Sequence, residues 1–499
     1  MNAQNTYPNR LFLIIVLFFA ATGIGINLYA TVWGAALSDD SFSYIKPARD
    51  IISGLPYQFN AHYPPGLPLI LAAIGKLTSL DPIDGIRYIN ALCFGLNIFL
   101  SGLLVKNASK SPFFGVASAS LVLLAQPMIE VHAWAMSEAL FISLVLSCLT
   151  CLGQYLETRQ ISWLIPSIIL AGFASLTRYA GTALIAAGGL TLLLYQGRRW
   201  TRRWFDFFLF AGIAGGLFLI YPLSMSSVSR EFQSVSGFRF GSIGLEDWNE
   251  LIYTSLLWLM PGRLARGREF LIAGTITVLL ISFPVTLAIL KHTQRSFFSW
   301  LRQIITSPHL FLLAFFAAAS GYILYQASQA DRYRSPYDFR LMAPIHLAIL
   351  LLSFILLGFA WPRLTRFFKV SFLILFTFVF GLYFQRAIDT TTLYHQDGMG
   401  FASRYWHDSD LLDFIGATEP DTFLVTTAPY GVYFATNRQT ELFSNYTPEQ
   451  LADRLKESHG YFIMIESMPI ELYGINSQDY LSRLREVLEL NNAIVFQAP

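Results

Sequence analysis

Residues 11–44 read LFLIIVLFFAATGIGINLYATVWGAALSDDSFSY. The run from residue 11 to residue 33 is apolar, and a helix needs about 20 such residues to cross a bilayer. The run exceeds the core of a cleaved signal peptide, which is about 7–15 residues long, so we expect a retained membrane anchor. The acidic pair Asp39-Asp40 follows directly. This order, a membrane span and then two carboxylates, indicates polar chemistry at the membrane boundary.

The whole chain has the composition of a membrane protein. Of its 499 residues, 54% are hydrophobic and only 13% are charged, and the mean hydropathy is +0.48. Soluble proteins carry about 25% charged residues, so this charge cannot cover a solvated surface of this size. A net charge of +2 gives no field that would attract a polyanion. The composition therefore excludes an ordinary soluble enzyme, a disordered chain and a nucleic-acid-binding protein.

Eleven apolar runs are candidate membrane helices, which predicts a polytopic α-helical membrane protein. The fifth and sixth runs are short and flank Thr177-Arg178-Tyr179, so we expect two half-length helices that meet at the outer face, or one interrupted span. The runs cover residues 11–33, 87–105, 113–129, 138–156, 162–176, 180–196, 206–224, 270–290, 309–328, 341–360 and 370–386.

The positions of the basic residues indicate how the chain is oriented. The densest cluster, Arg198, Arg199, Arg202 and Arg203, lies between the sixth and seventh runs. Cytoplasmic loops carry an excess of lysine and arginine. We therefore expect an integral plasma-membrane protein with a cytoplasmic N-terminus and, after an odd number of spans, an extracytoplasmic C-terminus.

Two outer loops are long enough to hold structure of their own. In the first, residues 34–86, apolar residues recur at helical spacing after the acidic pair. This spacing predicts an amphipathic helix on the membrane surface that is closed by Gly54. The second, residues 225–269, is predicted to contain a short interfacial helix at residues 248–260. We assign both loops to a transmembrane domain that covers residues 1–386.

Residues 387–499 form a second, extracytoplasmic domain. This segment holds 16 of the chain's 32 acidic residues, and it alternates short apolar runs with polar helical patterns. Thr447 and Gln450 have the spacing of a helix capping box. The pattern predicts a small α/β domain. Its predicted strands are 423–427, 461–465 and 493–496, and its predicted helices are 447–458 and 477–488.

Carboxylates on the outer side are the first candidate catalytic groups. They are Asp39, Asp40 and Glu138, which opens the fourth span. A partly desolvated carboxylate has a raised pKa and is a better proton acceptor. Structural roles are also open: Ser38 or Asp39 could cap the helix that follows, and Glu138 is a favourable charge at a helix N-terminus. The three carboxylates could also hold a divalent cation, although no Cys/His cluster has metal-ligand spacing.

Side chains at the same boundary are candidates for binding a phosphate. Arg178 lies between the two short spans, Arg334 and Arg340 precede the tenth span, and His62 and Tyr63 precede a Pro-Pro-Gly turn. The donor fork of arginine fits phosphate geometry. The alternatives are that Arg178 snorkels to the interface and that His62 belongs to a rigid, purely structural turn.

The order of these features resembles the GT-C superfamily of integral-membrane glycosyltransferases. The resemblance is closest to the branch of protein O-mannosyltransferases and lipid A aminoarabinose transferases. It covers residues 11–386. The matching features are Asp39-Asp40 with Tyr44 and Ala48-Arg49 at the family's spacing, Tyr63-Pro64-Pro65, Glu138, Leu176-Thr177-Arg178, and Arg340 before Pro344.

The resemblance implies a function. The family transfers a sugar, with inversion, from a polyprenyl-phosphate-linked donor in the bilayer to a cell-envelope acceptor (lipid, glycan or protein) on the extracytoplasmic face. Asp40 matches the catalytic carboxylate because Tyr44 falls at the expected distance from it. The aminoarabinose transferases have a lysine where this chain has Tyr63, so Arg178, Arg340 or His62 would meet the donor phosphate. Many enzymes of this type need no metal, so we expect none here, although a divalent cation is compatible.

Two other functions are compatible with the sequence. The chain could be a transporter or flippase of a lipid-linked sugar, or a catalytically inactive GT-C relative that binds lipid. A transporter places ionisable residues at the middle of several spans. Nearly all charges of this chain lie at span boundaries and in loops. This distribution favours the enzyme.

Overall fold

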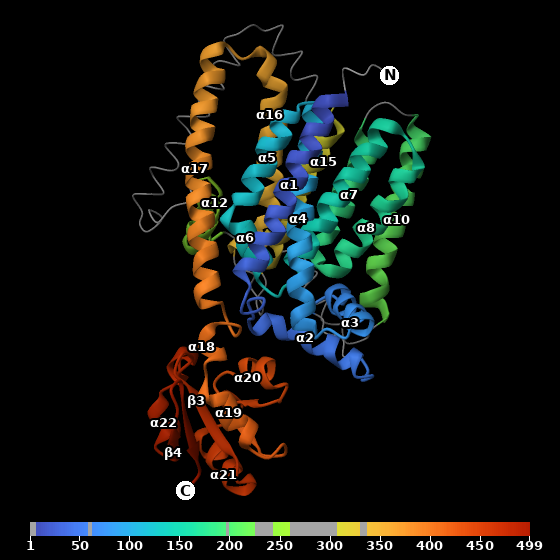
Figure 1. Cartoon of the computed structure of the whole chain (residues 1–499). Coiled ribbons are helices and arrows are strands. Elements are labelled where there is room, and N and C mark those ends of the chain that lie inside the picture. Colours follow the sequence, from blue (N-terminus) through green and yellow to red (C-terminus); the bar gives the residue numbers. More distant parts are fainter. Residues whose placement is uncertain (1–5, 58–61, 196–198, 225–242, 260–306, 330–336) are drawn as a thin grey trace. The chain divides into compact units, whose positions relative to one another are not determined.

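The computed structural model describes residues 6–57, 62–195, 199–224, 243–259, 307–329 and 337–499 (Figure 1). The chain divides by internal contacts into two units. The helical unit contains Met1–Ala30 and Pro47–Thr392, and the α/β unit contains Thr31–Lys46 and Leu393–Pro499. The acidic pair therefore groups with residues that lie more than 300 positions later in the chain.

The helical unit is a bundle of apolar helices (Figure 1). Two helices cross a unit boundary: α2 (Asp39–Ile52) begins in the α/β unit, and α17 (Arg366–Asp397) ends there. The others are α1 (Thr6–Ala30), α3 (Gly66–Thr78), α4 (Pro82–Ser109), α5 (Pro112–Leu124), α6 (Gln126–Ala133), α7 (Glu138–Thr158), α8 (Ile161–Thr177), α9 (Thr182–Leu194), α10 (Trp200–Ser224), α12 (Leu245–Leu259), α15 (Pro308–Ser328) and α16 (Phe339–Ala360).

The polytopic membrane fold is confirmed, but the number of eleven spans is not established. Ten predicted spans fall on helices of the structure, and the span predicted at 270–290 lies outside the described residues. Seven described helices are long and apolar enough to cross a membrane, or eight if α5 and α6, which meet at 56°, form one bent span. Helices α8 and α9 are shorter, and a 3-10 turn at Tyr179–Gly181 separates them.

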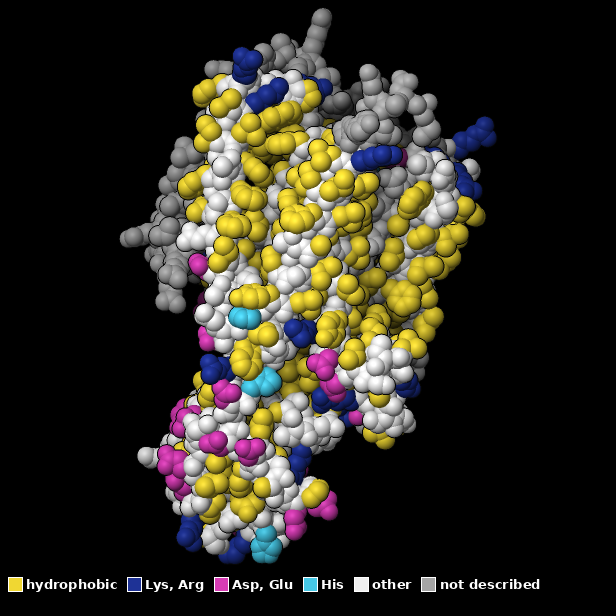
Figure 2. All heavy atoms as spheres, viewed as in Figure 1, with side chains coloured by type: hydrophobic (Ala, Val, Ile, Leu, Met, Phe, Trp, Pro, Cys, Tyr) yellow, Lys and Arg dark blue, Asp and Glu magenta, His cyan; other side chains and the backbone are white. Residues whose placement is uncertain are grey.

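The helical unit carries large apolar side chains on its surface as well as in its core. Figure 2 shows hydrophobic side chains covering much of this face of the bundle. Ile14 and Phe18 of α1 are 64% and 66% exposed, and Phe378 of α17 is 60% exposed. A soluble monomer rarely carries a continuous apolar surface of this kind. These side chains suit contact with lipid, where the helices satisfy their own backbone hydrogen bonds.

Local signals explain where the helices near the predicted site begin. The Asp81 side chain accepts a hydrogen bond from the Ile83 amide at 2.9 Å, and Pro82 occupies the first turn of α4. Both features are favourable at a helix N-terminus. The same carboxylate forms an ion pair with Arg49, whose Nε lies 2.9 Å from Asp81 Oδ2. This pair joins the end of α2 to the start of α4.

The α/β unit is built on a five-stranded mixed sheet with the strand order β2-β1-β3-β5-β4. Strand β1 runs parallel to β2 and β3, whereas β5 runs antiparallel to β3 and β4. The strands are β1 (Leu424–Thr426), β2 (Glu441–Leu442), β3 (Tyr461–Ile465), β4 (Arg485–Glu489) and β5 (Ala493–Gln497). The helices are α18 (Arg404–His407), α19 (Asp410–Ala417), α20 (Pro429–Thr436), α21 (Pro448–Ser458) and α22 (Ser477–Leu481).

Both faces of this sheet are covered. Ile463 and Ile465 of β3 pack with side chains of α19 and α20, whereas Phe462 packs with side chains of α21 and α22. Successive strand residues point to opposite faces, so a strand that is apolar at neighbouring positions supports a core on each side. The unit is therefore a three-layer α/β/α sandwich.

Most of the elements predicted in residues 387–499 are confirmed. Strands β1, β3 and β5 lie within two residues of their predicted limits, and α21 begins with the predicted capping box at Thr447 and Gln450. The helix predicted at 477–488 is wrong in its second half. It ends at Leu481, and Arg485–Glu489 forms β4. The turn at Asn491-Asn492 folds β4 back on β5, and ladder hydrogen bonds to β5 outweigh local helix propensity.

The helices predicted in the two outer loops are present. The first is α2, and Gly54 follows it with a φ of +80°, a conformation that favours glycine. The second is α12 (Leu245–Leu259). The structure contains no bilayer, so the location of both helices at the membrane surface stays a prediction.

Arg438 stabilises the turn that connects α19 to β1. Its Nη1 donates to Thr418 Oγ1 at 2.7 Å and to Ile415 O at 3.4 Å. Its Nη2 donates to the carbonyl oxygens of Glu419 and Thr422, at 2.7 and 2.6 Å. One guanidinium therefore satisfies acceptors along the whole turn.

We predict that Arg438→Ala destabilises the α/β unit by about 2–4 kcal/mol, because several hydrogen bonds from a charged donor are lost together. Limited proteolysis of the full-length protein at residues 415–422 measures the effect. Lys456→Ala is the control, since Lys456 is an exposed residue in the last turn of α21, where a surface substitution changes stability little. Equal cleavage of the two variants would contradict the prediction.

Candidate functional site

Two of the predicted arginines converge on the three residues that lead into α7. Arg178 Nη1 lies 2.7 Å from Glu138 Oε1 and 3.0 Å from Ser137 Oγ. Arg340 Nη1 lies 2.6 Å from the sulfur of Met136. Three predicted site residues, Glu138, Arg178 and Arg340, therefore meet on one short segment of the helical unit.

The Glu138–Arg178 pair is largely buried. The Glu138 side chain is 5% exposed and that of Arg178 is 19% exposed. Burying a carboxylate is costly unless an opposite charge and hydrogen bonds compensate for it. Arg178 compensates through one oxygen, whereas Glu138 Oε2 has no hydrogen-bond partner among the described residues. A buried acceptor without a hydrogen bond adds to the cost of burying this carboxylate.

The Pro-Pro-Gly turn packs directly against the turn that carries Arg178. A Cβ atom at Gly66 would lie 2.7 Å from Leu176 O and 3.0 Å from Thr177 Oγ1. Only glycine permits this approach between the start of α3 and the end of α8. His62 and Tyr63, both half-buried, immediately precede this turn. The structure thus brings a third predicted motif next to the arginine pair.

Two asparagines of α4 hold the segment that carries Glu138. Asn90 Nδ2 donates to Trp134 O at 2.7 Å, and Asn97 Nδ2 donates to Ala139 O at 3.4 Å. Both asparagines are almost completely buried. They fix the backbone on each side of residues 136–138, which presents Glu138 to Arg178.

A buried histidine extends this network. His132 lies with Nδ1 2.6 Å from Met128 O and Nε2 2.9 Å from Asn97 Nδ2. Since the carbonyl oxygen can only accept, Nδ1 carries the proton and Nε2 accepts from Asn97. Asn90, Asn97 and His132 were not among the predicted site residues. For the two asparagines, a polar residue inside the apolar run 87–105 was a signal that could have found them.

The acidic pair belongs to the α/β unit. Asp39 and Asp40 form the first turn of α2, where negative charge is favourable. The Ser38 hydroxyl has no hydrogen-bond partner among the described residues, so it does not cap this helix. Partial burial and then the neighbouring carboxylate of Asp40 raise the pKa of Asp39. These effects increase the proton affinity of Asp39.

The segment that carries the acidic pair is anchored to C-terminal residues. Trp33 Nε1 donates to His395 O at 3.0 Å, and its ring lies 5.5 Å from that of His407. The Phe401 amide donates to Leu37 O at 2.9 Å. These contacts join both ends of the loop 33–37 to the start of the C-terminal chain. They thereby fix the backbone that leads into Asp39.

The remaining predicted site residue, Arg334, lies outside the described residues. In the part of the chain that the structure describes, no group of three or more His, Cys, Asp or Glu side chains could hold a metal ion. Glu138, one of the three carboxylates considered for a cation, is paired with Arg178 instead.

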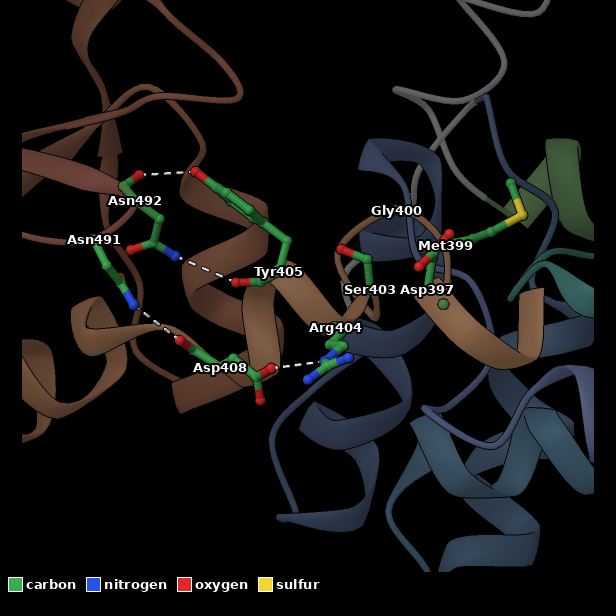
Figure 3. Close-up of a pocket in the computed structure, with 10 residues that line it drawn as sticks. Asp397, Met399, Gly400, Ser403, Arg404, Tyr405, Asp408, Asn491 and Asn492 are labelled. Carbon is green, nitrogen blue, oxygen red and sulfur yellow. Dashed lines mark hydrogen bonds and ion pairs between the residues drawn. The ribbon is translucent and has the colours of Figure 1, made fainter. Parts of the chain in front are cut away.

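The α/β unit also contains a hollow of about 690 Å³ (Figure 3). Figure 3 shows Arg404 and Tyr405 of α18 and Asp408 opposite Asn491 and Asn492 of the β4–β5 turn. These groups pair with one another. Arg404 Nε lies 2.9 Å from Asp408 Oδ2, and Tyr405 donates to Asn492 O at 2.8 Å. The polar groups on this side of the hollow therefore have a structural role, because they hold the β4–β5 turn against α18.

We predict that Arg178→Ala destabilises the helical unit by about 3–5 kcal/mol, because it leaves a buried carboxylate without its partner. The double variant Glu138→Gln/Arg178→Ala recovers part of this loss, since the buried charge is gone. Thermal unfolding of the detergent-solubilised protein measures both. Lys110→Ala is the matched control, because Lys110 pairs with Glu157 at 2.9 Å but is 68% exposed. A double variant as unstable as the single one would contradict the prediction.

Part of the chain matches the model of a known protein family, and nearly the whole chain resembles a solved structure. Residues 62–225, which include His62, Glu138 and Arg178, match the family model of dolichyl-phosphate-mannose-protein mannosyltransferases. No curated protein sequence matches the chain significantly. The crystal structure of ArnT from Cupriavidus metallidurans bound to undecaprenyl phosphate is similar, with a TM-score of 0.56, 15% sequence identity, and coverage of 96% of this chain and 97% of that chain. The resemblance of this chain to the GT-C membrane glycosyltransferases is thereby confirmed.

Proposed function

We propose that the chain is a membrane glycosyltransferase that moves a sugar from a polyprenyl-phosphate-linked donor to an acceptor hydroxyl. The observation that carries this proposal is the convergence of Arg178 and Arg340 on residues 136–138. Two guanidinium groups at one short segment suit a phosphate group. The ArnT structure is bound to undecaprenyl phosphate, which supports a lipid phosphate as the carrier.

The two arginines would stabilise the leaving phosphate. Each is oriented by a carboxylate: Arg178 by Glu138 at 2.7 Å, and Arg340 by Asp338 at 3.1 Å. Donors that are already in place lower the barrier because they need no reorientation as charge develops. In this proposal Glu138 is a positioning residue for Arg178. His62 and Tyr63, next to the same turn, supply further donors to the phosphate.

Asp40 is the proposed catalytic carboxylate, with Asp39 as its neighbour. An acceptor oxygen attacks the anomeric carbon while the bond from that carbon to the phosphate oxygen breaks. The acceptor proton passes to the carboxylate, and the bonding electrons leave with the polyprenyl phosphate. Attack from the face opposite the leaving group inverts the anomeric centre. None of these steps requires a cation at the acidic pair.

The proposal includes an orientation in the plasma membrane. The N-terminus would lie in the cytoplasm, and the α/β unit and the acceptor, a cell-envelope lipid, glycan or protein, would lie outside. The cluster at residues 198–203 supports this orientation, because basic loops stay in the cytoplasm. The sugar is a hexose or a pentose.

We predict that Asp40→Asn lowers sugar transfer by about 10²–10⁴-fold, the usual contribution of a general base. The measurement is mass spectrometry of envelope extracts incubated with purified protein and their own lipid-linked donor. Asp39→Asn tests the neighbouring acid in the same assay. Asp84→Asn is the control, since Asp84 is an exposed acid in the first turn of α4.

Full transfer by both Asp40→Asn and Asp39→Asn would contradict the assignment of the acidic pair as the catalytic carboxylates. Movement of the donor headgroup across vesicles without any covalent transfer by the wild-type protein would instead support a transporter. Lipid binding with neither transfer nor movement would support an inactive relative.

We predict that a cysteine in place of Glu457 reacts with a membrane-impermeant maleimide in intact cells. A cysteine in place of Thr201 should react only after the membrane is opened. Both positions are exposed, and they lie on opposite sides in the proposed topology. The native Cys93 and Cys148 are buried, and replacing Cys151 removes background labelling by the maleimide at that residue. Labelling of the Thr201 position in intact cells would reverse the orientation.

A further inference from the structure

An aromatic cluster of the α/β unit surrounds the first turn of α2. The ring of Phe42 lies 4.6 Å from that of Tyr430 and 5.0 Å from that of Tyr433, measured between centroids. Tyr430 and Tyr433 belong to α20, which follows β1. Tyr433 is buried, whereas Tyr430 is only half-buried. Tyr430 is therefore the ring of this pair that reaches the surface.

The carboxylate of Asp39 lies on the same side of α2 as Phe42. Residues three apart on a helix are neighbours on its surface. The Tyr430 ring, which is tilted by 42° against that of Phe42, therefore packs on the side of α2 that carries Asp39. The charges agree: burial and then the Asp39 carboxylate raise the pKa of Tyr430, and both also raise the pKa of Tyr473. The negative charge of Asp39 therefore acts on both tyrosines.

The two hydroxyls differ in what they bind. The Tyr473 hydroxyl donates to Thr427 O at 2.5 Å, which ties it to the start of α20. The Tyr430 hydroxyl has no hydrogen-bond partner among the described residues. A tyrosine hydroxyl can donate one hydrogen bond and accept others. This hydroxyl can therefore hold a second hydroxyl group beside the acidic pair.

We propose that Tyr430 contacts the hydroxyl-bearing group of the acceptor, so that the α/β unit supplies part of the acceptor-binding site beside the acidic pair. This inference rests on the proposed glycosyltransferase function and adds to it a specificity-determining residue outside the helical unit. The ring of Tyr430 is fixed by Phe42, and its hydroxyl is the binding group. The same contact explains why residues 31–46 fold with the C-terminal chain.

The test compares Tyr430→Phe, which keeps the ring and removes the hydroxyl, with the wild-type protein. The donor fraction of an envelope lipid extract is held at saturation while the acceptor fraction is titrated. Loss of one hydrogen bond raises the half-saturating amount of acceptor by about 3–10-fold. The half-saturating amount of donor and the unfolding temperature stay unchanged. Tyr405→Phe is the matched control, since its hydroxyl binds Asn492 O within the same unit.

Tyr430→Ala checks the packing role separately, because removal of the ring also lowers the unfolding temperature. An unchanged acceptor titration for Tyr430→Phe overturns the inference, as does an equal shift for donor and acceptor. Asp40→Asn is measured in the same preparation. If that variant is inactive and Tyr430→Phe behaves as wild type, only the inference fails. If Asp40→Asn and Asp39→Asn are both fully active, the assignment of the acidic pair fails. If the wild-type protein transfers no sugar, the proposed function fails.

Discussion

The buried ion pair between Glu138 and Arg178 constrains the rest of the helical unit. A carboxylate that is 5% exposed in an apolar bundle requires a cation, and Arg178 reaches it only because the chain breaks between α8 and α9. Gly66 lets the Pro-Pro-Gly turn pack against that break. Asn90 and Asn97 then fix the backbone around Glu138 from α4. Segments far apart in sequence thus meet because one charge must be neutralised.

Local and compositional signals were sufficient to predict much of this architecture. Apolar runs located ten described helices, the capping box located the start of α21, and the order of motifs pointed to the residues that converge on Glu138. What failed depends on contacts distant in sequence. Arg485–Glu489 becomes a strand because β5 offers a partner, and the asparagines of α4 matter because of what lies opposite them. The type of a single residue does not reveal which distant residue it will contact.

The grouping of Thr31–Lys46 with the C-terminal chain is the least expected feature. By sequence, the acidic pair follows the first membrane span and belongs to the transmembrane domain. By contacts, it is held by Trp33 on His395, by Leu37 on Phe401, and by Phe42 on Tyr430. These three anchors lie within ten residues, so the α/β unit controls the conformation of this segment more than the preceding helix does.

This grouping separates two chemical tasks. The arginines proposed to bind the donor phosphate are fixed within the helical unit, by carboxylates and by the turn next to Gly66. The acids proposed to activate the acceptor are fixed within the α/β unit, beside Tyr430. A lipid carrier common to many enzymes demands a constant phosphate site, whereas acceptors differ in shape. Because each unit has its own core, the acceptor side can change in evolution without disturbing the buried Glu138–Arg178 pair.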